Sequence, residues 1–210
     1  MTTSHSRDLA VDENGAHTLE RVMDTALELI KDGDGDYYLL VTGTSMLPLV
    51  QTGDYVRIKK FSGELRRGDI VVFLTSGVLF THRILHINRR NSNGTTYMTK
   101  GDNSVLPDPP ITSRVIIGKV VAIRRNNREM MLDNRLWQIT NHLIGSLMSA
   151  LVTLYSVVIG TRPIKPGEEL GLLHRLFRRG MLTISSSVIT LLRVLISRWH
   201  VVMPREGELN

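Results

Sequence analysis

Ser45 stands in a sequence context that suits a nucleophile. It lies in the segment VTGTSMLP, residues 41–48, directly after a predicted strand. A nucleophilic serine needs an exposed hydroxyl on a rigid turn, with free backbone N–H groups that stabilise an oxyanion. Gly43 and Pro48 predict a tight, non-helical path that leaves the N–H groups of Gly43, Thr44 and Ser45 available. The alternative is a turn serine that hydrogen-bonds its own backbone.

A histidine in a later predicted strand supplies a candidate base. The segment FTHRILHI, residues 80–87, contains His82 and His86. Because side chains alternate along a strand, we expect His82, Ile84 and His86 to share one face. Histidine is the side chain whose unperturbed pKa lies near neutrality, as a general base for serine requires. His82 is the favoured base, His86 is its rival, and a histidine without a chemical role is the remaining interpretation.

The loop KGDNSVLPD, residues 100–108, brings two carboxylates into reach of such a histidine. Asp102 or Asp108 could accept the imidazole N–H, fix the tautomer and stabilise the imidazolium. Plain turn chemistry is the alternative, because Gly-Asp-Asn is also a good turn. A calcium site using Asp102, Asn103 and Asp108 would need a fuller ladder of oxygen ligands than the chain shows, so no metal is expected.

The elements that must position these residues are mainly strands. Leu19–Ile30 has helical spacing, and this predicts a charged amphipathic helix over 19–31 that is too short to cross a bilayer. From residue 37 to 132 the pattern changes to short β-rich runs between turn signals. This predicts a mainly β, antiparallel core rather than βαβ units. The runs are residues 37–42, 54–59, 69–74, 79–87, 95–99, 115–124 and 129–132.

The chain after residue 132 is predicted to be helical. No charged residue lies between Arg135 and Arg162, and this stretch is long enough for a membrane-spanning helix, which stays an open alternative. However, small and polar side chains (Gln138, His142, Gly145, Ser149, Thr153 and Ser156) recur in it every three or four positions. Such a stripe favours close packing against another helix. The apolar run 181–192 is predicted to be interfacial or packed back on the first helix. Three regions follow, namely 1–36, a catalytic region at 37–132, and a helical region at 133–210.

The charge of the chain is concentrated in that helical region. Residues 1–120 carry 14 basic and 14 acidic side chains, whereas residues 121–210 carry 12 basic and 6 acidic ones. Basic residues beside apolar helices favour an anionic lipid surface, so membrane contact through 136–161 and 181–203 is expected, most simply at the plasma membrane. A solvated basic face and a soluble cytoplasmic enzyme are the alternatives. No nucleic-acid-binding signature is present, and the absence of cysteine excludes thiol chemistry.

The order of the segments resembles that of the type I signal peptidases. A Gly-x-Ser-Met-x-Pro turn is followed by Arg-Gly-Asp leading into Val-Val-Phe, then Thr-His-Arg-Ile, then Lys-Gly-Asp-Asn, and the similarity runs from about Val41 to Ile123. It is closer to the serine–histidine branch, found in endoplasmic-reticulum, archaeal and some Gram-positive enzymes, than to the serine–lysine branch. His82 stands where the second branch carries lysine.

This resemblance implies a serine endopeptidase that cleaves signal-peptide-like precursors after small residues. Ser45 would be the nucleophile and His82 the base, with Asp108 as the third catalytic residue and Asp102 ordering the site. Its partners would be protein or peptide substrates, and no metal or organic cofactor is implied.

The sequence departs from that family at Gly43, where relatives often carry a serine whose hydroxyl helps to form the oxyanion hole. Either backbone N–H groups act alone here, or Thr42 or Thr44 substitutes. The usual N-terminal transmembrane anchor is replaced by the helix at 19–31, and the helical tail is longer than the core requires.

Two other functions share this pattern. Self-cleaving repressors and mutagenesis proteins have the same Gly-x-Ser-Met turn, but they use lysine as base and cut at a small-residue–Gly bond, and no Ala-Gly dipeptide occurs here. A binding module built on a core that no longer cuts is the alternative from a different class, and the glycine at position 43 is the feature that favours it.

Overall fold

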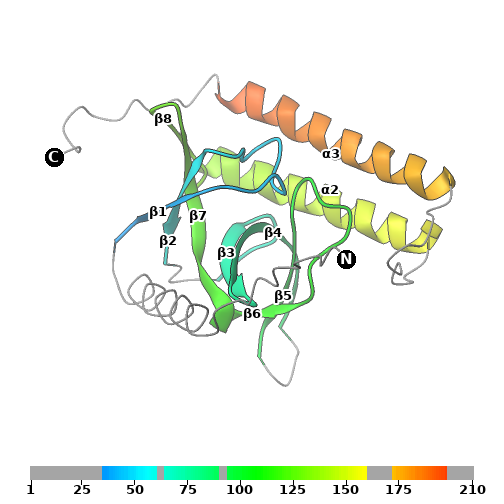
Figure 1. The fold of residues 1–210 in the computed structure, drawn as a ribbon, viewed down its shortest axis with the longest axis horizontal. Helices are drawn as coiled ribbons and strands as arrows, with labels where there is room; N and C mark the ends of the chain where they lie inside the picture. Colours follow the sequence, from blue (N-terminus) through cyan, green and yellow to red (C-terminus); the bar gives the residue numbers. More distant parts are fainter. Residues whose placement is uncertain (1–34, 61–63, 90–93, 160–171, 198–210) are drawn as a thin grey trace, which may run out of the picture.

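The computed structural model describes residues 35–60, 64–89, 94–159 and 172–197. Within these ranges the chain forms one eight-stranded antiparallel sheet followed by two long helices, α2 (Arg135–Ile159) and α3 (Leu172–Ser197) (Figure 1). The strands are β1 (Tyr37–Leu40), β2 (Tyr55–Lys59), β3 (Ile70–Thr75), β4 (Val78–Asn88), β5 (Thr96–Lys100), β6 (Ile111–Thr112), β7 (Ile116–Arg125) and β8 (Arg128–Met131).

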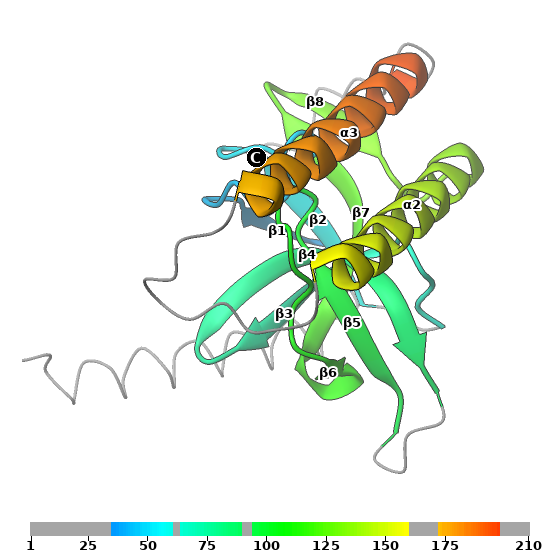
Figure 2. The same cartoon turned by 90° about the vertical axis from the view of Figure 1, so that its right-hand side faces the viewer.

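The sheet has the strand order β1-β2-β7-β3-β4-β5-β6, with β8 paired to β7. Register shifts interrupt the pairing of β2 with β7, of β3 with β7 and of β4 with β5. Such bulges increase local twist, and the sheet is visibly curled (Figure 2). Both of its faces are buried, since Val72 belongs to a cluster shared with the helices and Val71 to a second cluster inside the curl.

The helix α2 lies across the sheet and α3 lies beside α2 (Figure 1). Asn134 caps α2, because its side chain accepts a hydrogen bond of 2.9 Å from the Trp137 N–H. Trp137 is buried in the main cluster together with Ile189 of α3, so both helices join one core. The expectation that the second apolar run packs back on the first helix is confirmed. Neither described helix is long and apolar enough to cross a membrane.

The predicted fold class is confirmed, and every predicted strand is present with its ends within two residues of the prediction. The two-residue strand β6 was not predicted, because a run that short carries no periodic signal. The predicted helix at 19–31 lies outside the described residues. The packing role expected for Gly145 is wrong. A Cβ atom there would stand 2.8 Å from the Gly68 Cα, so this glycine lets α2 approach a turn of the β region rather than another helix.

Candidate active site

Ser45, His82 and Asp108 form a continuous line of polar contacts. The Ser45 Oγ lies 3.0 Å from the His82 Nε2, and the His82 Nδ1 lies 2.7 Å from the Asp108 Oδ2. The three residues come from the turn after β1, from β4 and from the loop between β5 and β6. The carboxylate fixes the tautomer, because an acceptor at Nδ1 keeps the proton there and leaves the Nε2 lone pair facing the hydroxyl.

The imidazole of His82 is held in place by β4 and by two aromatic rings. His82 pairs with Val71 in the β3–β4 ladder and is 4% exposed. Its ring centroid lies 6.0 Å from that of Phe73 and 5.6 Å from that of Phe80. These contacts restrict rotation of the His82 ring, so Nδ1 stays directed at Asp108 and Nε2 at Ser45.

The prediction that His86 shares the face of His82 is wrong. The β4–β5 register shifts between Ile84 and His86, which pair with consecutive residues of β5. One extra residue in a strand reverses the alternation beyond it. His86 is consequently exposed, whereas Ile87 packs with the cluster near His82.

Asp108 is held by Thr99. The Asp108 N–H donates to the Thr99 carbonyl at 2.8 Å, and the Thr99 hydroxyl donates to the Asp108 Oδ2 at 2.7 Å. Thr99 is fully buried in β5. The same carboxylate oxygen therefore receives a hydroxyl and faces the imidazole, which fixes its orientation. Sequence reasoning missed Thr99, although its place in the strand just before the aspartate loop would have suggested it.

The turn that carries Ser45 is held against the aspartate loop (residues 100–108) by Asn103. Its N–H donates to the Ser45 carbonyl at 2.7 Å, and its side-chain amide donates to the Thr44 carbonyl at 3.2 Å. Gly101 permits this approach, because a Cβ atom there would lie 2.6 Å from the Ser45 carbonyl oxygen. The Gly-Asp-Asn segment thus forms a turn and also contacts the turn that carries Ser45.

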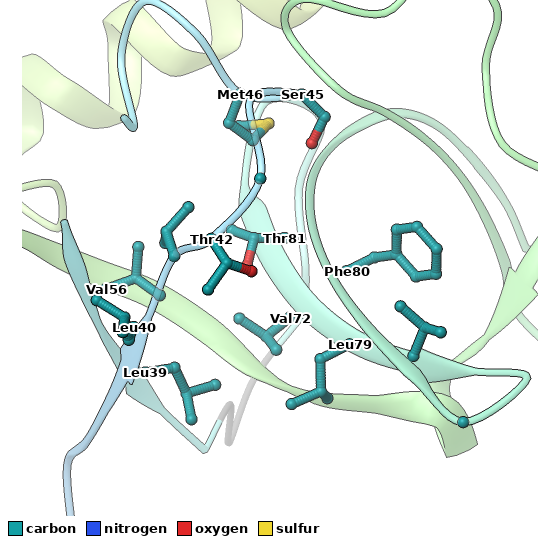
Figure 3. A pocket seen from close by; sticks show the side chains of 14 residues that line it. Leu39, Leu40, Thr42, Ser45, Met46, Val56, Val72, Leu79, Phe80 and Thr81 are labelled. Carbon is teal, nitrogen blue, oxygen red and sulfur yellow. The ribbon is translucent and has the colours of Figure 1, made fainter. Parts of the chain in front are cut away.

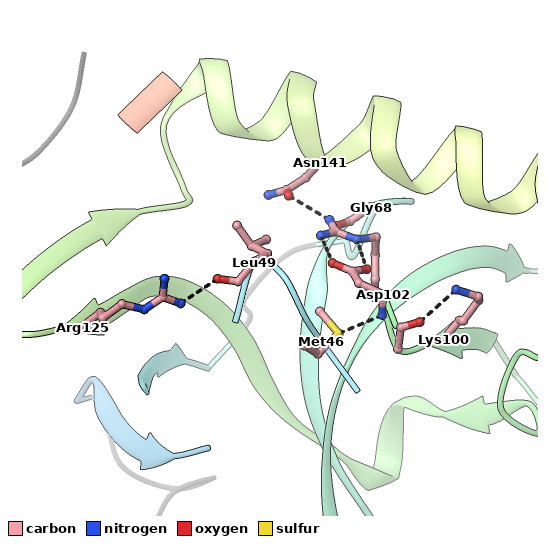
Figure 4. A network of polar contacts seen from close by, with 9 residues as sticks. Met46, Leu49, Gly68, Lys100, Asp102, Arg125 and Asn141 are labelled. Carbon is pink, nitrogen blue, oxygen red and sulfur yellow. Dashed lines mark hydrogen bonds and ion pairs between the residues drawn. The ribbon is translucent and has the colours of Figure 1, made fainter. Parts of the chain in front are cut away.

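Asp102 does not contact the histidine but forms a buried ion pair with Arg83. The Nε and Nη2 groups of Arg83 donate to the two Asp102 oxygens, each at 2.8 Å, and both side chains are fully buried. The Nη1 group of Arg83 donates to the Gly68 carbonyl at 2.9 Å and to the Asn141 Oδ1 of α2 at 2.8 Å (Figure 4). Asp102 therefore orders the loop next to Asn103. Neither Arg83 nor Asn141 was predicted.

Lys100 is a second buried cation beside this pair. It lies opposite Arg83 in the β4–β5 ladder, is 2% exposed, and its Nζ donates to the Gly101 carbonyl at 2.9 Å. The pKa of Lys100 is lowered to about 8, mainly by burial and also by the nearby Arg83, against the opposing attraction of Asp102 and Asp108. Its ammonium is directed to a backbone carbonyl of the aspartate loop.

The turn that carries Ser45 has backbone N–H groups that could stabilise an oxyanion. Among the described residues, none accepts a hydrogen bond from the N–H groups of Gly43, Thr44 or Ser45. The Gly43 carbonyl accepts the Thr52 hydroxyl at 3.0 Å, which holds the turn on its other side. No atom lies within 4 Å of the position a Cβ would take at Gly43, so the space beside the turn is open.

A pocket of about 520 Å³ begins at Ser45 and extends between the β1 segment and β4 (Figure 3). It is largely apolar, and it exposes one side of the turn that carries the serine. Its lining comprises Leu39, Leu40, Val41, Thr42, Gly43, Ser45, Met46, Val56, Val72, Gly77, Val78, Leu79, Phe80 and Thr81.

A hydroxyl, an imidazole and a carboxylate in line, with free N–H groups beside the hydroxyl, can carry out acyl transfer. Together with the curled antiparallel sheet, this arrangement defines a serine peptidase fold. The chain belongs to the Peptidase S24-like family, whose model matches residues 7–121. No individual curated protein matches the sequence significantly.

Proposed function

We propose that this protein is a serine endopeptidase of the signal-peptidase type, with Ser45 as nucleophile and His82 as general base. The observation that carries the proposal is the unbroken line from the Ser45 Oγ through both ring nitrogens of His82 to Asp108. Each member has the partner that its role needs, and in the described part of the chain no other ionisable side chain lies within hydrogen-bond distance of the Ser45 hydroxyl.

The reaction begins with neutral His82. Its Nε2 takes the proton of the Ser45 hydroxyl as the oxygen attacks the peptide carbonyl carbon, and Asp108 stabilises the imidazolium that forms. The C–N bond breaks as His82 returns the proton to the leaving amine, which yields the acyl-enzyme. A water molecule, deprotonated by the same nitrogen, then attacks the ester and releases Ser45.

Backbone N–H groups of the turn hold the oxyanion. Ser45 and Thr44 offer N–H groups beside the nucleophile, and Gly43 lacks the hydroxyl that a serine would add. Loss of one such donor costs on the order of a hundredfold or more in rate in other serine peptidases. We therefore expect a slow enzyme.

An extended precursor segment with small residues before the scissile bond is the proposed substrate. The apolar pocket beside Ser45 supports an apolar segment, since Leu40, Val56 and Leu79 line it. The strand β1 ends the sheet and pairs only with β2 among the described strands, so a substrate backbone can add to that edge. The preference for small residues rests on the family resemblance.

Cleavage of a signal-peptide-like substrate with alanine before the scissile bond tests this proposal. Ser45→Ala should abolish cleavage, and His82→Ala should reduce it by roughly a thousandfold or more. His86→Ala is the matched control and should keep full activity, because His86 is exposed beyond the bulge. Activity that survives Ser45→Ala would refute the nucleophile, and a His86→Ala variant as weak as His82→Ala would refute the base.

Self-cleavage is the second candidate, because the Peptidase S24-like match fits a self-cleaving protein equally well. Mass spectrometry of the intact chain during incubation separates the two. Under our proposal the chain stays intact while an added substrate is cut. Truncation in wild type but not in Ser45→Ala would favour self-cleavage. A fluorophosphonate probe that fails to label Ser45 in the folded protein would instead favour a binding module.

A further inference from the structure

The two helices carry apolar side chains on the face turned away from the β region. We define this outer face by Leu136, Ile139, Leu143, Leu154 and Val157 of α2 with Leu176, Ile184 and Leu191 of α3, which are between 49% and 78% exposed. Scattered surface leucines are ordinary, but exposed apolar side chains that recur along two neighbouring helices are typical of an interaction site.

Helix geometry shows that these positions form stripes. At 100° per residue, the α2 positions fall within an arc of about 60° and the α3 positions within about 80°. A separate side of each helix holds the buried residues, such as Trp137 and Ile144 on α2 and Met181 and Ile189 on α3. Each helix is thus apolar on two sides, and the core uses one of them.

The charge of the hairpin indicates what covers the outer face. The segments α2 and α3 contain five arginines and no acidic residue. Arg135, Arg175 and Arg179 are exposed. A second copy placed face to face would bring Arg135 and Arg179 near like charges, and α2 and α3 themselves supply no acidic side chain to pair with them, which disfavours a symmetric dimer. An anionic lipid surface is complementary to both features of the hairpin, because its acyl chains accept the apolar side chains and its headgroups attract the arginines.

We propose that the outer face docks on an anionic membrane surface, with α2 and α3 lying in the interface plane. This mode of attachment agrees with the finding that neither described helix can cross a bilayer. The proposal does not depend on the proposed peptidase activity, because Ser45 and its partners take no part in it.

Vesicle flotation of the full chain tests this inference. Two membranes are compared, phosphatidylcholine alone and phosphatidylcholine mixed with phosphatidylglycerol. The test variant is Leu154→Glu with Ile184→Glu, on the outer face. The control is Thr153→Glu with Ser186→Glu, which adds the same charges at exposed positions of the two helices outside the apolar arcs. All four side chains are solvent-exposed, so thermal unfolding should be unchanged.

Wild type and control should float with the phosphatidylglycerol vesicles, and the outer-face variant should bind roughly tenfold more weakly or worse. Binding to phosphatidylcholine alone should be weaker, and salt should reduce binding to the anionic vesicles. Failure of wild type to float, or equal loss in variant and control, would overturn the proposal. If wild type instead forms a concentration-dependent dimer and the outer-face variant stays monomeric, a second copy of the chain is the occupant of the outer face. The Ser45→Ala protein should float like wild type, which keeps this outcome separate from that of the activity assay.

Discussion

Asn141 of α2 and Arg83 of β4 are joined by a hydrogen bond of 2.8 Å between the Asn141 Oδ1 and the Arg83 Nη1. Arg83 also donates to Asp102, and the N–H of the next residue, Asn103, donates to the Ser45 carbonyl. A residue of the helical hairpin therefore supports the loop that holds Ser45, the proposed nucleophile.

Replacing Asn141 by Leu should destabilise the fold by about 1.5–3 kcal/mol, because it removes a hydrogen bond to a buried charged group. The activity of the folded variant should fall, since the Asp102 loop loses one of its supports. Urea unfolding and kcat/KM of the folded fraction measure the two effects. His142→Leu, at the adjacent exposed position, is the control and should change neither. Equal stability of Asn141→Leu and wild type would contradict the role of this contact.

Replacing Asp108 by Asn should reduce kcat by up to about ten thousandfold while leaving stability nearly unchanged, because the imidazole loses its counter-charge and its preferred tautomer. Thr99→Val removes only the hydroxyl that orients Asp108, so its loss should be much smaller. Single-turnover kinetics on the signal-peptide-like substrate compares the two. A Thr99→Val enzyme as slow as Asp108→Asn would mean that the threonine, rather than the carboxylate charge, governs the histidine.

Replacing Gly43 by Ser should raise kcat by roughly tenfold to a hundredfold, because its hydroxyl would supply a donor that the oxyanion site lacks. The open space at that position accommodates the side chain. Gly43→Ala is the control, with the same Cβ and no donor, and should leave the rate near that of wild type. If serine and alanine at this position give the same rate, the added hydroxyl does not stabilise the oxyanion, and the backbone N–H groups are its sole donors on this turn.

By contrast, Gly101→Ala should abolish activity and impair folding, because the added Cβ would stand 2.6 Å from the Ser45 carbonyl oxygen. Circular dichroism and the cleavage assay monitor the two losses. A folded and active Gly101→Ala protein would show that the two loops can separate without harm.

The stability of the protein should rise with pH between about 8 and 10.5 because of Lys100. Its pKa is lowered from 10.5 to about 8 in the folded state, so in this window the unfolded chain binds the extra proton. Burial of the ammonium costs the fold on the order of 3 kcal/mol below pH 8, and that cost falls through the window until the unfolded chain has lost the proton as well. Urea unfolding across this range should show the rise in wild type, and the Lys100→Met protein should lack it. A rise of equal size in both proteins would assign it to other groups.

Local sequence patterns were enough to predict the candidate catalytic residues and the class of fold. Alternating apolar residues and turn formers are local signals, so they placed the main strands correctly, and the serine, histidine and aspartate segments stood out by residue type and order. These properties depend on neighbours within a few residues, where periodicity and turn chemistry are strong.

Which histidine faces Ser45 depends on strand packing that a short stretch of sequence does not record. One bulged residue between Ile84 and His86 reverses a face, and no local signal marks it. The burial of Lys100 and the contact from Asn141 to Arg83 likewise depend on packing between segments far apart in the chain. Long-range contacts of this kind follow from how the curled sheet and α2 meet, which a short sequence window does not record.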